Sequence, residues 1–476
     1  MLTLEYYNWI NGRKENFPYI SPVPKDAPED KRFPIFASGL EYNYDTVTPV
    51  KLEIYKGAAD CGFNVCILPS VGMTNPLKGN LQNAEEAKVN ILFRNNYFLT
   101  DSNSIESIKK SSNLKDYINR IGGINFYEEP TYKMLNGDDI FIKESTGLIF
   151  TMPQSYKLFM VQDPPFMAYF NLVSFPGNDD YLEGIPESSS DRYGEYLNKF
   201  QELYKPAVFS YDIYPINEYS ALLHEGMGDR VYDTNNEGKI TVEYDNLFED
   251  LNRFSKLSRS VNRPFWTFTQ SMFHMFSNTA NIKPIALEQY LRFEAFISLA
   301  YGSKGIIYWT YGMRPNSLDE KTGNLEVYFS ALLNRRDEKT ASWYFAKKIN
   351  EEIQKYSDIF LNGTIDSVDI VESKLFNSYP FIIGFYTETA PNDKLNDDKR
   401  VKIIITKISH NKNTYFLIVN IDALNYHTLN INVQGNNIYE LTPETSKGEI
   451  NTLLKKGDHE RVLIPGGYRI FKTYLF

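Results

Sequence analysis

Cysteine and histidine are both scarce in this chain of 476 residues. It has two cysteines, Cys61 and Cys66, and five histidines that never form a close pair. A zinc site needs several Cys or His ligands at short spacings, and a disulfide framework needs more cysteines than two. We therefore predict no metal site and expect both cysteines to be buried as small apolar residues.

Long apolar runs and an excess of basic residues are also missing. No stretch approaches the roughly 18 apolar residues that cross a bilayer, so membrane insertion is not expected. Acidic residues outnumber basic ones by 60 to 50, and the net charge of −10 makes nucleic acid a poor partner. Glycine-rich nucleotide-binding motifs and Gly-x-Ser-x-Gly are absent, which argues against a nucleotide cofactor and a serine hydrolase. We expect no cofactor.

Aromatic residues, in contrast, are abundant. The chain contains 35 Tyr, 32 Phe and 4 Trp, or 15% of its residues. Most of them must fill the core, but aromatic faces also stack on sugar rings. This composition is compatible with a neutral ligand such as a carbohydrate.

Short apolar segments alternate with helical patterns over most of the chain, which favours parallel strands joined by crossover helices. We predict an extended N-terminal arm over residues 1–33 and a (β/α)8 barrel over residues 34–361, with a doubly wound open sheet as the alternative. The predicted barrel strands are residues 34–40, 64–69, 97–100, 124–127, 167–173, 208–213, 265–269 and 305–310.

The pattern changes after residue 361. Short strands then follow one another without helices between them, and turns such as Pro465-Gly466-Gly467 separate them. The sequence predicts an all-β domain over residues 362–476, most simply a small sandwich. Its expected strands are residues 368–371, 381–386, 401–407, 415–420, 428–433 and 468–474.

Active sites of such barrels lie at the C-terminal ends of the strands. The predicted fourth strand ends in Glu128-Glu129-Pro130, and the sixth carries Asp212 between two apolar side chains, a residue type that strands disfavour. The seventh ends at Gln270 and the eighth at Trp309, beside further aromatics. Paired carboxylates in an aromatic cleft are typical of glycoside hydrolysis.

Four segments together resemble barrel glycosidases of glycoside hydrolase family 42, or beta-galactosidase-like proteins. They are Gly123-Ile-Asn-Phe-Tyr-Glu-Glu-Pro130, Lys205-Pro-Ala-Val-Phe-Ser-Tyr-Asp-Ile-Tyr-Pro215, Arg263-Pro-Phe-Trp-Thr-Phe-Thr-Gln270 and Leu299-Ala-Tyr-Gly-Ser-Lys-Gly-Ile-Ile-Tyr-Trp309. The resemblance covers roughly residues 34–360. It implies that Glu129, directly before Pro130, is the acid/base residue, and that a nucleophilic glutamate should end the seventh strand.

The chain departs from that family pattern at two positions. Glu128 stands where the family usually has Asn, and Gln270 occupies the place of the nucleophile. A neutral amide cannot form the glycosyl ester of the ordinary retaining route. Asp212 is our choice for the second carboxylate. Glu41, after the first strand, is another candidate, and Glu288 or Glu294 in the following helix ranks last.

We therefore predict a metal-independent glycoside hydrolase with catalytic Glu129 and Asp212. The residues expected to hold the oligosaccharide or glycoside are Glu41, Glu128, Tyr211, Gln270 and Trp309. The alternative is a non-catalytic carbohydrate-binding protein on a degenerate glycosidase barrel. Met1–Glu5 lacks the basic start of a signal peptide, so secretion or a periplasmic location is expected only if a leader has been removed.

Overall fold

The computed structural model of this chain describes two compact units. One comprises Met1–Ile285 with Gly305–Lys347, and the other Ala286–Lys304 with Lys348–Phe476. The domain boundaries predicted at residues 33 and 361 stay predictions. The residues that the structure describes are 22–28, 31–40, 48–68, 75–94, 115–138, 140–143, 148–152, 168–172, 179–204, 206–219, 240–242, 244–276, 281–283, 286–313, 317–318, 325–372, 382–387, 402–423, 425–433, 437–442 and 450–474.

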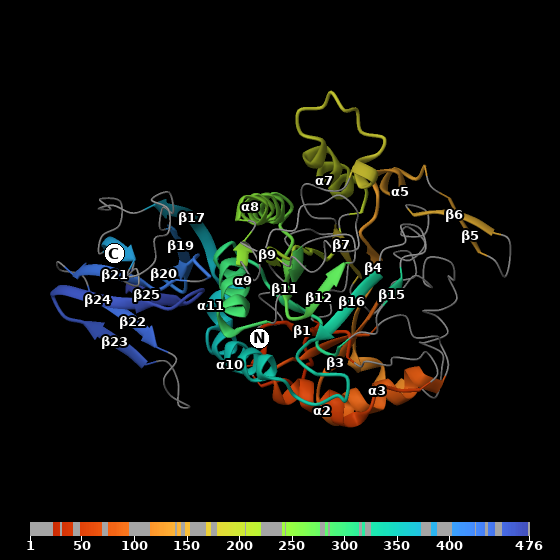
Figure 1. The fold of residues 1–476 in the computed structure, drawn as a ribbon, viewed down its shortest axis with the longest axis horizontal. Helices are drawn as coiled ribbons and strands as arrows, with labels where there is room; N and C mark the ends of the chain where they lie inside the picture. Colours follow the sequence, from red (N-terminus) through yellow and green to blue (C-terminus); the bar gives the residue numbers. More distant parts are fainter. Residues whose placement is uncertain are drawn as a thin grey trace. The chain divides into compact units, whose positions relative to one another are not determined.

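Eight parallel strands close into a barrel, which confirms the predicted architecture (Figure 1). Seven of them overlap the segments expected from the sequence. Around the barrel the strands are β1 (Ile35–Ser38), β14 (Ile306–Trp309), β11 (Phe265–Gln270), β8 (Val208–Tyr211), β7 (Ala168–Leu172), β4 (Ile121–Glu128), β3 (Asn90–Arg94) and β2 (Val65–Leu68).

The third strand was predicted at the wrong place. Residues 97–100 lie outside the described part of the chain, and the strand at this position of the barrel is β3, Asn90–Arg94. β3 begins three residues after the helix α3 (Asn75–Ala87) ends. The acidic and alanine-rich sequence in front of Asn90 continues a helical pattern up to the strand, which hides its start.

Amphipathic helices connect the strands. In α7 (Arg192–Leu203) the side chains of Tyr193, Tyr196, Leu197 and Phe200 are buried, at the spacing of one helix face. Phe200 packs on Phe170 of β7 and Phe209 of β8. The other helices in this part of the chain are α2 (Leu52–Asp60), η2 (Lys115–Arg120), α5 (Tyr132–Asn136), η3 (Asp179–Leu182), α8 (Tyr244–Val261), α9 (Glu288–Ala300) and α10 (Ala341–Lys355). Of these, α9 is not amphipathic, and α10 follows the last barrel strand instead of connecting two.

Aromatic rings fill the barrel interior. The ring of Trp266 on β11 lies 4.4 Å from Phe36 on β1 and 5.3 Å from Tyr169 on β7, centroid to centroid. Neither β1 nor β7 is a neighbour of β11, so these contacts cross the interior. Because side chains alternate along a strand, Asn171 and Gln270 face the same interior at its C-terminal end.

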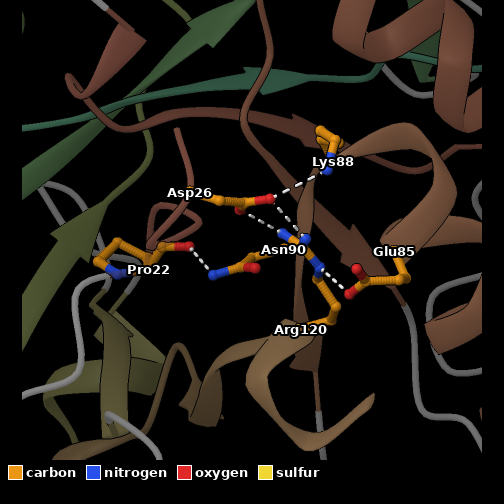
Figure 2. Close-up of polar contacts among 6 residues, drawn as sticks. All are labelled: Pro22, Asp26, Glu85, Lys88, Asn90 and Arg120. Atoms are coloured by element: carbon orange, nitrogen blue, oxygen red, sulfur yellow. Dashed lines mark hydrogen bonds and ion pairs between the residues drawn. The ribbon is translucent and has the colours of Figure 1, made fainter. Parts of the chain in front are cut away.

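The segment Pro22–Pro28 is bonded to residues at the N-terminal starts of β3 and β4 (Figure 2). Arg120, 5% exposed, donates two hydrogen bonds of 2.9 Å to Asp26 and one of 2.5 Å to Glu85. Asn90 Nδ2 donates to the carbonyl of Pro22 at 2.9 Å. Side-chain hydrogen bonds thus fix part of the predicted arm to the start of β3 and β4.

An antiparallel sheet of six short strands arises from three loops at the opposite end. β9 and β10 follow β8, β12 and β13 follow β11, and β15 and β16 follow β14. The sheet order is β10 (Ile240–Val242), β9 (Ile216–Tyr219), β13 (Asn281–Lys283), β12 (Phe273–Phe276), β16 (Leu325–Ser330) and β15 (Ser317–Leu318). No sequence pattern predicted this sheet, because its paired strands lie far apart in the chain.

The second unit contains a β-sandwich, as predicted. Residues of both sheets, including Phe416, Leu429 and Phe471, share one apolar core. The sheets are β17 (Thr364–Glu372), β19 (Lys402–His410), β20 (Asn413–Asn420), β25 (Tyr468–Tyr474), β22 (Ile438–Thr442) and β23 (Ile450–Leu454), and β18 (Ile382–Thr387), β21 (His427–Val433) and β24 (Gly457–Leu463).

The helix α9 belongs to this second unit. Eleven of its thirteen side chains are buried, and Phe296 stacks on Tyr468 of β25 at 3.8 Å. A helix that is buried on all sides cannot show the one-sided pattern of a surface helix. Among the described helices, none has both the length and the apolarity needed to cross a bilayer.

Candidate active site

Glu129 lies directly after β4, where the chain leaves the barrel wall. Its φ of +48° falls in the left-handed region, which non-glycine residues rarely adopt. The side chain is half-buried, and its Oε2 accepts a 3.0 Å hydrogen bond from the Tyr181 hydroxyl of η3. A strained backbone at the C-terminal end of a barrel strand is a feature of functional sites.

Three consecutive residues anchor this turn. The backbone N–H of Glu129 donates to the carbonyl of Asn171 on β7 at 2.8 Å. The next carbonyl, of Pro130, accepts a hydrogen bond from the Tyr196 hydroxyl of α7 at 2.9 Å. Thr131 then caps α5 by accepting from the N–H of Met134. These contacts hold the strained conformation and with it the position of the Glu129 carboxyl group.

Asp212 follows β8 and is also half-buried. Its Oδ1 accepts a 3.0 Å hydrogen bond from Asn171 Nδ2, and its Oδ2 accepts one of 3.2 Å from the Tyr214 hydroxyl. Both donors are neutral and both stabilise a charged carboxylate.

The structure brings Glu129 and Asp212 to the same end of the barrel. They lie at the ends of β4 and β8, which are separated by β7 alone. Asn171, 1% exposed at the end of β7, contacts both: its carbonyl accepts from Glu129 and its side chain donates to Asp212. The two predicted catalytic residues are therefore coupled through one buried residue.

Glu128 is the last residue of β4 and is paired in register with Asn171. A register shift between Asn125 and Tyr127 adds one residue to β4 there. Such a bulge changes which side chains face inward. The simple alternation of strand side chains therefore does not decide between Glu128 and Glu129, and the half-buried Glu128 stays a predicted substrate contact.

Gln270 ends β11 at the predicted nucleophile position. Its side chain is 3% exposed, and Nε2 donates to the carbonyl of Ile216 on β9 at 3.2 Å. This hydrogen bond joins the end of a barrel strand to the accessory sheet. An amide suits that structural task, and its proposed role in holding a sugar stays a prediction.

The two aromatic candidates occupy different positions. Trp309 is half-buried and packs with Tyr214 against an apolar cluster of Met272, Met313 and Ala331. The hydroxyl group of the same Tyr214 donates a hydrogen bond to the Asp212 carboxylate. Tyr211 is 1% exposed and stacks on Phe254 of α8 at 4.1 Å. Tyr211 thus faces the helix layer, and this position does not support a contact with substrate.

Of the remaining candidates for a second carboxylate, two belong to the second compact unit and one is not described. Glu41 lies outside the described residues. Glu288 begins α9 and pairs with Arg292 and Lys348, and despite partial burial these partners hold the pKa of Glu288 below its ordinary value. Glu294 is a buried residue of the same helix. Both belong to the second compact unit.

Asn171 and Tyr181 were missed in the sequence. Asn171 interrupts the otherwise apolar strand Ala-Tyr-Phe-Asn-Leu. Strands disfavour Asn as they disfavour Asp, the residue type that drew attention to Asp212. That signal could have identified it. Tyr181 sits in a short 3-10 turn among polar residues, where nothing in the sequence distinguishes it from other tyrosines.

Cys61 and Cys66 are both buried, as predicted, and they are not joined in a disulfide. Burial raises the pKa of the Cys66 thiol far above its ordinary value, so this side chain is not a nucleophile. Within the described ranges, no three His, Cys, Asp or Glu side chains are grouped so that they could hold a metal ion.

No family model and no curated protein sequence matches this chain. Solved structures that are similar to it include a beta-galactosidase from the psychrophilic Marinomonas ef1 (8% identity, TM-score 0.40, covering 69% of this chain and 62% of the other). Another is a GH27 β-L-arabinopyranosidase from Geobacillus stearothermophilus in complex with arabinose (9%, 0.44, 99% of each chain). A third is the maltogenic α-amylase AmyB from Thermotoga neapolitana (9%, 0.41, 94% and 100%).

The chain spans less than two thirds of the length of the Marinomonas protein. All three proteins are glycosidases by name, and their sequence identity to this chain is below 10%. The chain is thus similar in structure to glycoside hydrolase barrels at low sequence identity.

Proposed function

We propose that this protein is a glycoside hydrolase in which Glu129 is the general acid and Asp212 the second carboxylate. The observation that carries the proposal is the shared contact with Asn171, which accepts the backbone N–H of Glu129 and donates to the Asp212 carboxylate at the C-terminal end of the barrel. General acid catalysis combined with a second carboxylate is the usual chemistry of glycosidic bond cleavage.

Glu129 would protonate the oxygen of the leaving group. The Tyr181 hydroxyl donates to Oε2 and orients the Glu129 carboxyl group. The half-buried position favours the neutral acid before reaction, because burial penalises the charged form of a carboxyl group. Tyr181 would then stabilise the carboxylate that proton transfer leaves behind.

Asp212 would act as a base on water rather than as the nucleophile. Two strand spacings separate the backbones of β4 and β8, or about 9.5 Å. A separation of about 6.5–9.5 Å between the carboxyl groups leaves room for a water molecule and gives inversion at the anomeric carbon, whereas about 5 Å gives retention. The anomer released first distinguishes the two routes, and we propose inversion, in which Asp212 takes a proton from the attacking water.

A test of this proposal is a panel of aryl glycosides of common hexoses and pentoses, followed by proton NMR of the released sugar. Wild-type protein should hydrolyse at least one of them, and the first anomer seen should have the configuration opposite to that of the substrate. Asp212→Asn should lower kcat about 1,000-fold. Full activity of Asp212→Asn would contradict the assignment of the second carboxylate.

A non-catalytic carbohydrate-binding protein is the second candidate. The observation that favours it is Gln270, a neutral amide bonded to Ile216 at the place where the resemblance implies a nucleophile. Sugar binding without any turnover, by calorimetry and NMR on the same panel, would support this alternative. Turnover that depends on Asp212 would exclude it.

A further inference from the structure

We propose that Asn171 is a positioning residue that sets the charge state and orientation of Asp212 and the backbone position of Glu129. This inference rests on the proposed function, because its catalytic consequences require hydrolysis. Asn171 is 1% exposed, and all its polar side-chain atoms are engaged: Nδ2 donates to Asp212 at 3.0 Å and Oδ1 accepts from Ser210 at 2.9 Å.

The orientation of the Asn171 amide follows from its two partners. An ionised carboxylate can only accept hydrogen bonds, so the atom facing Asp212 must be the NH2 group. The Ser210 hydroxyl can donate, and it faces the amide oxygen. Ser210 lies two residues before Asp212 on the same strand, so one strand supplies both groups that fix the amide.

The backbone of Asn171 performs a separate task. Its carbonyl accepts the N–H of Glu129 at 2.8 Å, at the residue whose φ is +48°. In the register of the sheet, Asn171 of β7 is paired with Glu128 of β4 on one side and with Ser210 of β8 on the other. A displacement of the end of β7 would therefore move both carboxyl groups together, which makes Asn171 a common support for the acid and the base.

Substitution of the amide by a carboxylate tests the side-chain task. In Asn171→Asp one oxygen can still accept from Ser210, and the other faces Asp212 where the donor was. Two carboxylates at about 3 Å cannot both be ionised near neutral pH, so protonation of the pair is favoured. Asp212 is then no longer available as a base until the pH is higher.

The titratable side chains on the elements beside Asn171 are the same in both proteins. Among the described residues they are Tyr127, Glu128 and Glu129 at the end of β4, Tyr181 of η3, Tyr211 of β8, and Asp212 and Tyr214 after β8. A change in the pH profile between wild type and Asn171→Asp therefore reports on residue 171.

The kinetic experiment compares the pH dependence of kcat for wild type, Asn171→Asp and Ser210→Ala. For Asn171→Asp we expect the acidic limb to move up by at least one pH unit, kcat on that limb to fall about tenfold for each pH unit of the shift, and KM to change less than about threefold. Ser210→Ala should shift the limb in the same direction by less, because the amide loses one of its two fixing contacts.

A matched control is Asn64→Asp at the other end of the barrel. Asn64 is also a buried amide (6% exposed): Oδ1 accepts from the N–H of Ile35, and Nδ2 donates to the carbonyls of Lys31 and Phe33. All three of these hydrogen bonds are to backbone groups and none is to a carboxylate. Asn64→Asp should lower the free energy of unfolding and leave the acidic limb in place. An unmoved limb in Asn171→Asp, or an equal shift in Asn64→Asp, would overturn the positioning role.

A second readout does not require catalysis. Protein with carbon-13-labelled Asp carboxyls, with the Asp212 resonance assigned from Asp212→Asn, gives the titration of that group by NMR. We expect its midpoint to rise by at least one pH unit in Asn171→Asp. If wild type hydrolyses no glycoside but the midpoint moves, the positioning holds and the proposed function fails. If it does not move, the positioning role is wrong whatever the activity.

Discussion

The two ends of the barrel use carboxylates in different ways. At the N-terminal end, Asp26 and Glu85 bind the buried guanidinium of Arg120, and the charges fasten the segment Pro22–Pro28 to β3 and β4 (Figure 2). At the C-terminal end, Glu129 and Asp212 accept hydrogen bonds from the neutral donors Tyr181, Asn171 and Tyr214. A cation locks a carboxylate in its charged form, whereas a neutral donor orients it and leaves it able to exchange a proton.

Glu129→Gln should have the largest effect, and it should be on catalysis. Loss of a general acid typically costs 100- to 10,000-fold, so we expect kcat to fall about 1,000-fold. Gln keeps the shape of the side chain and can still accept from Tyr181, so the unfolding midpoint in urea should stay close to wild type. The matched change at the other end, Glu85→Gln, should leave kcat unchanged. Equal kcat for both variants would remove the distinction between the two ends.

Arg120→Met should have the largest effect on stability. It removes three charge-assisted hydrogen bonds to Asp26 and Glu85, and because both carboxylates are about half exposed we expect a loss of about 2 kcal/mol in the free energy of unfolding. Urea unfolding measures this change, with kcat of the folded protein as the control. A loss below about 0.5 kcal/mol would show that the arm is held by other contacts.

Gly122→Ala tests how closely the arm approaches β4. A Cβ atom at Gly122 would lie 2.7 Å from the carbonyl oxygen and 3.1 Å from the Cα of Pro22, both backbone atoms. The arm must then shift, at a cost of about 1–2 kcal/mol. Thermal unfolding should show the loss, and limited proteolysis should cut the chain before residue 22 faster. An unchanged melting temperature would contradict this close approach.

The smallest expected effect is the acid dependence of stability at Asp26. The hydrogen bonds from Arg120 lower the pKa of Asp26 from 3.8 to about 2. The unfolded state therefore binds more protons between about pH 4 and pH 2, and stability is lost as the pH falls through this range. The loss is about 1 kcal/mol after allowance for the exposed side chain. Asp26→Asn should lack this part of the pH dependence, and an identical acid profile in both proteins would contradict the ion pair.

The sequence predicted the fold better than the site. Barrel strands such as residues 208–213 and 265–269 carry their own apolar signal, and β8 and β11 lie within one or two residues of them. The accessory sheet could not be predicted, because strands of two to six residues from three loops pair only after the barrel has brought those loops together.

For the site, the position of a residue at the end of a predicted strand identified candidates, but the sequence did not show which residues of other strands contact them. Glu129 and Asp212 were proposed from the strand ends, and the structure places both at the C-terminal end of the barrel. Tyr211 was proposed as a sugar contact, but it faces α8, because alternation places it opposite to Ser210 and Asp212. Asn171 and Tyr181 act through contacts with residues 41 to 52 positions away, which no local pattern contains.

The most direct test of the central claim is the kcat of the double variant Glu129→Gln/Asp212→Asn beside the two single variants. Residues that act as a unit give losses that do not multiply. We predict that the double variant is no slower than the slower single variant, to within about threefold. Losses that multiply would contradict the pairing of Glu129 with Asp212, and so would single variants that turn over substrate like wild type.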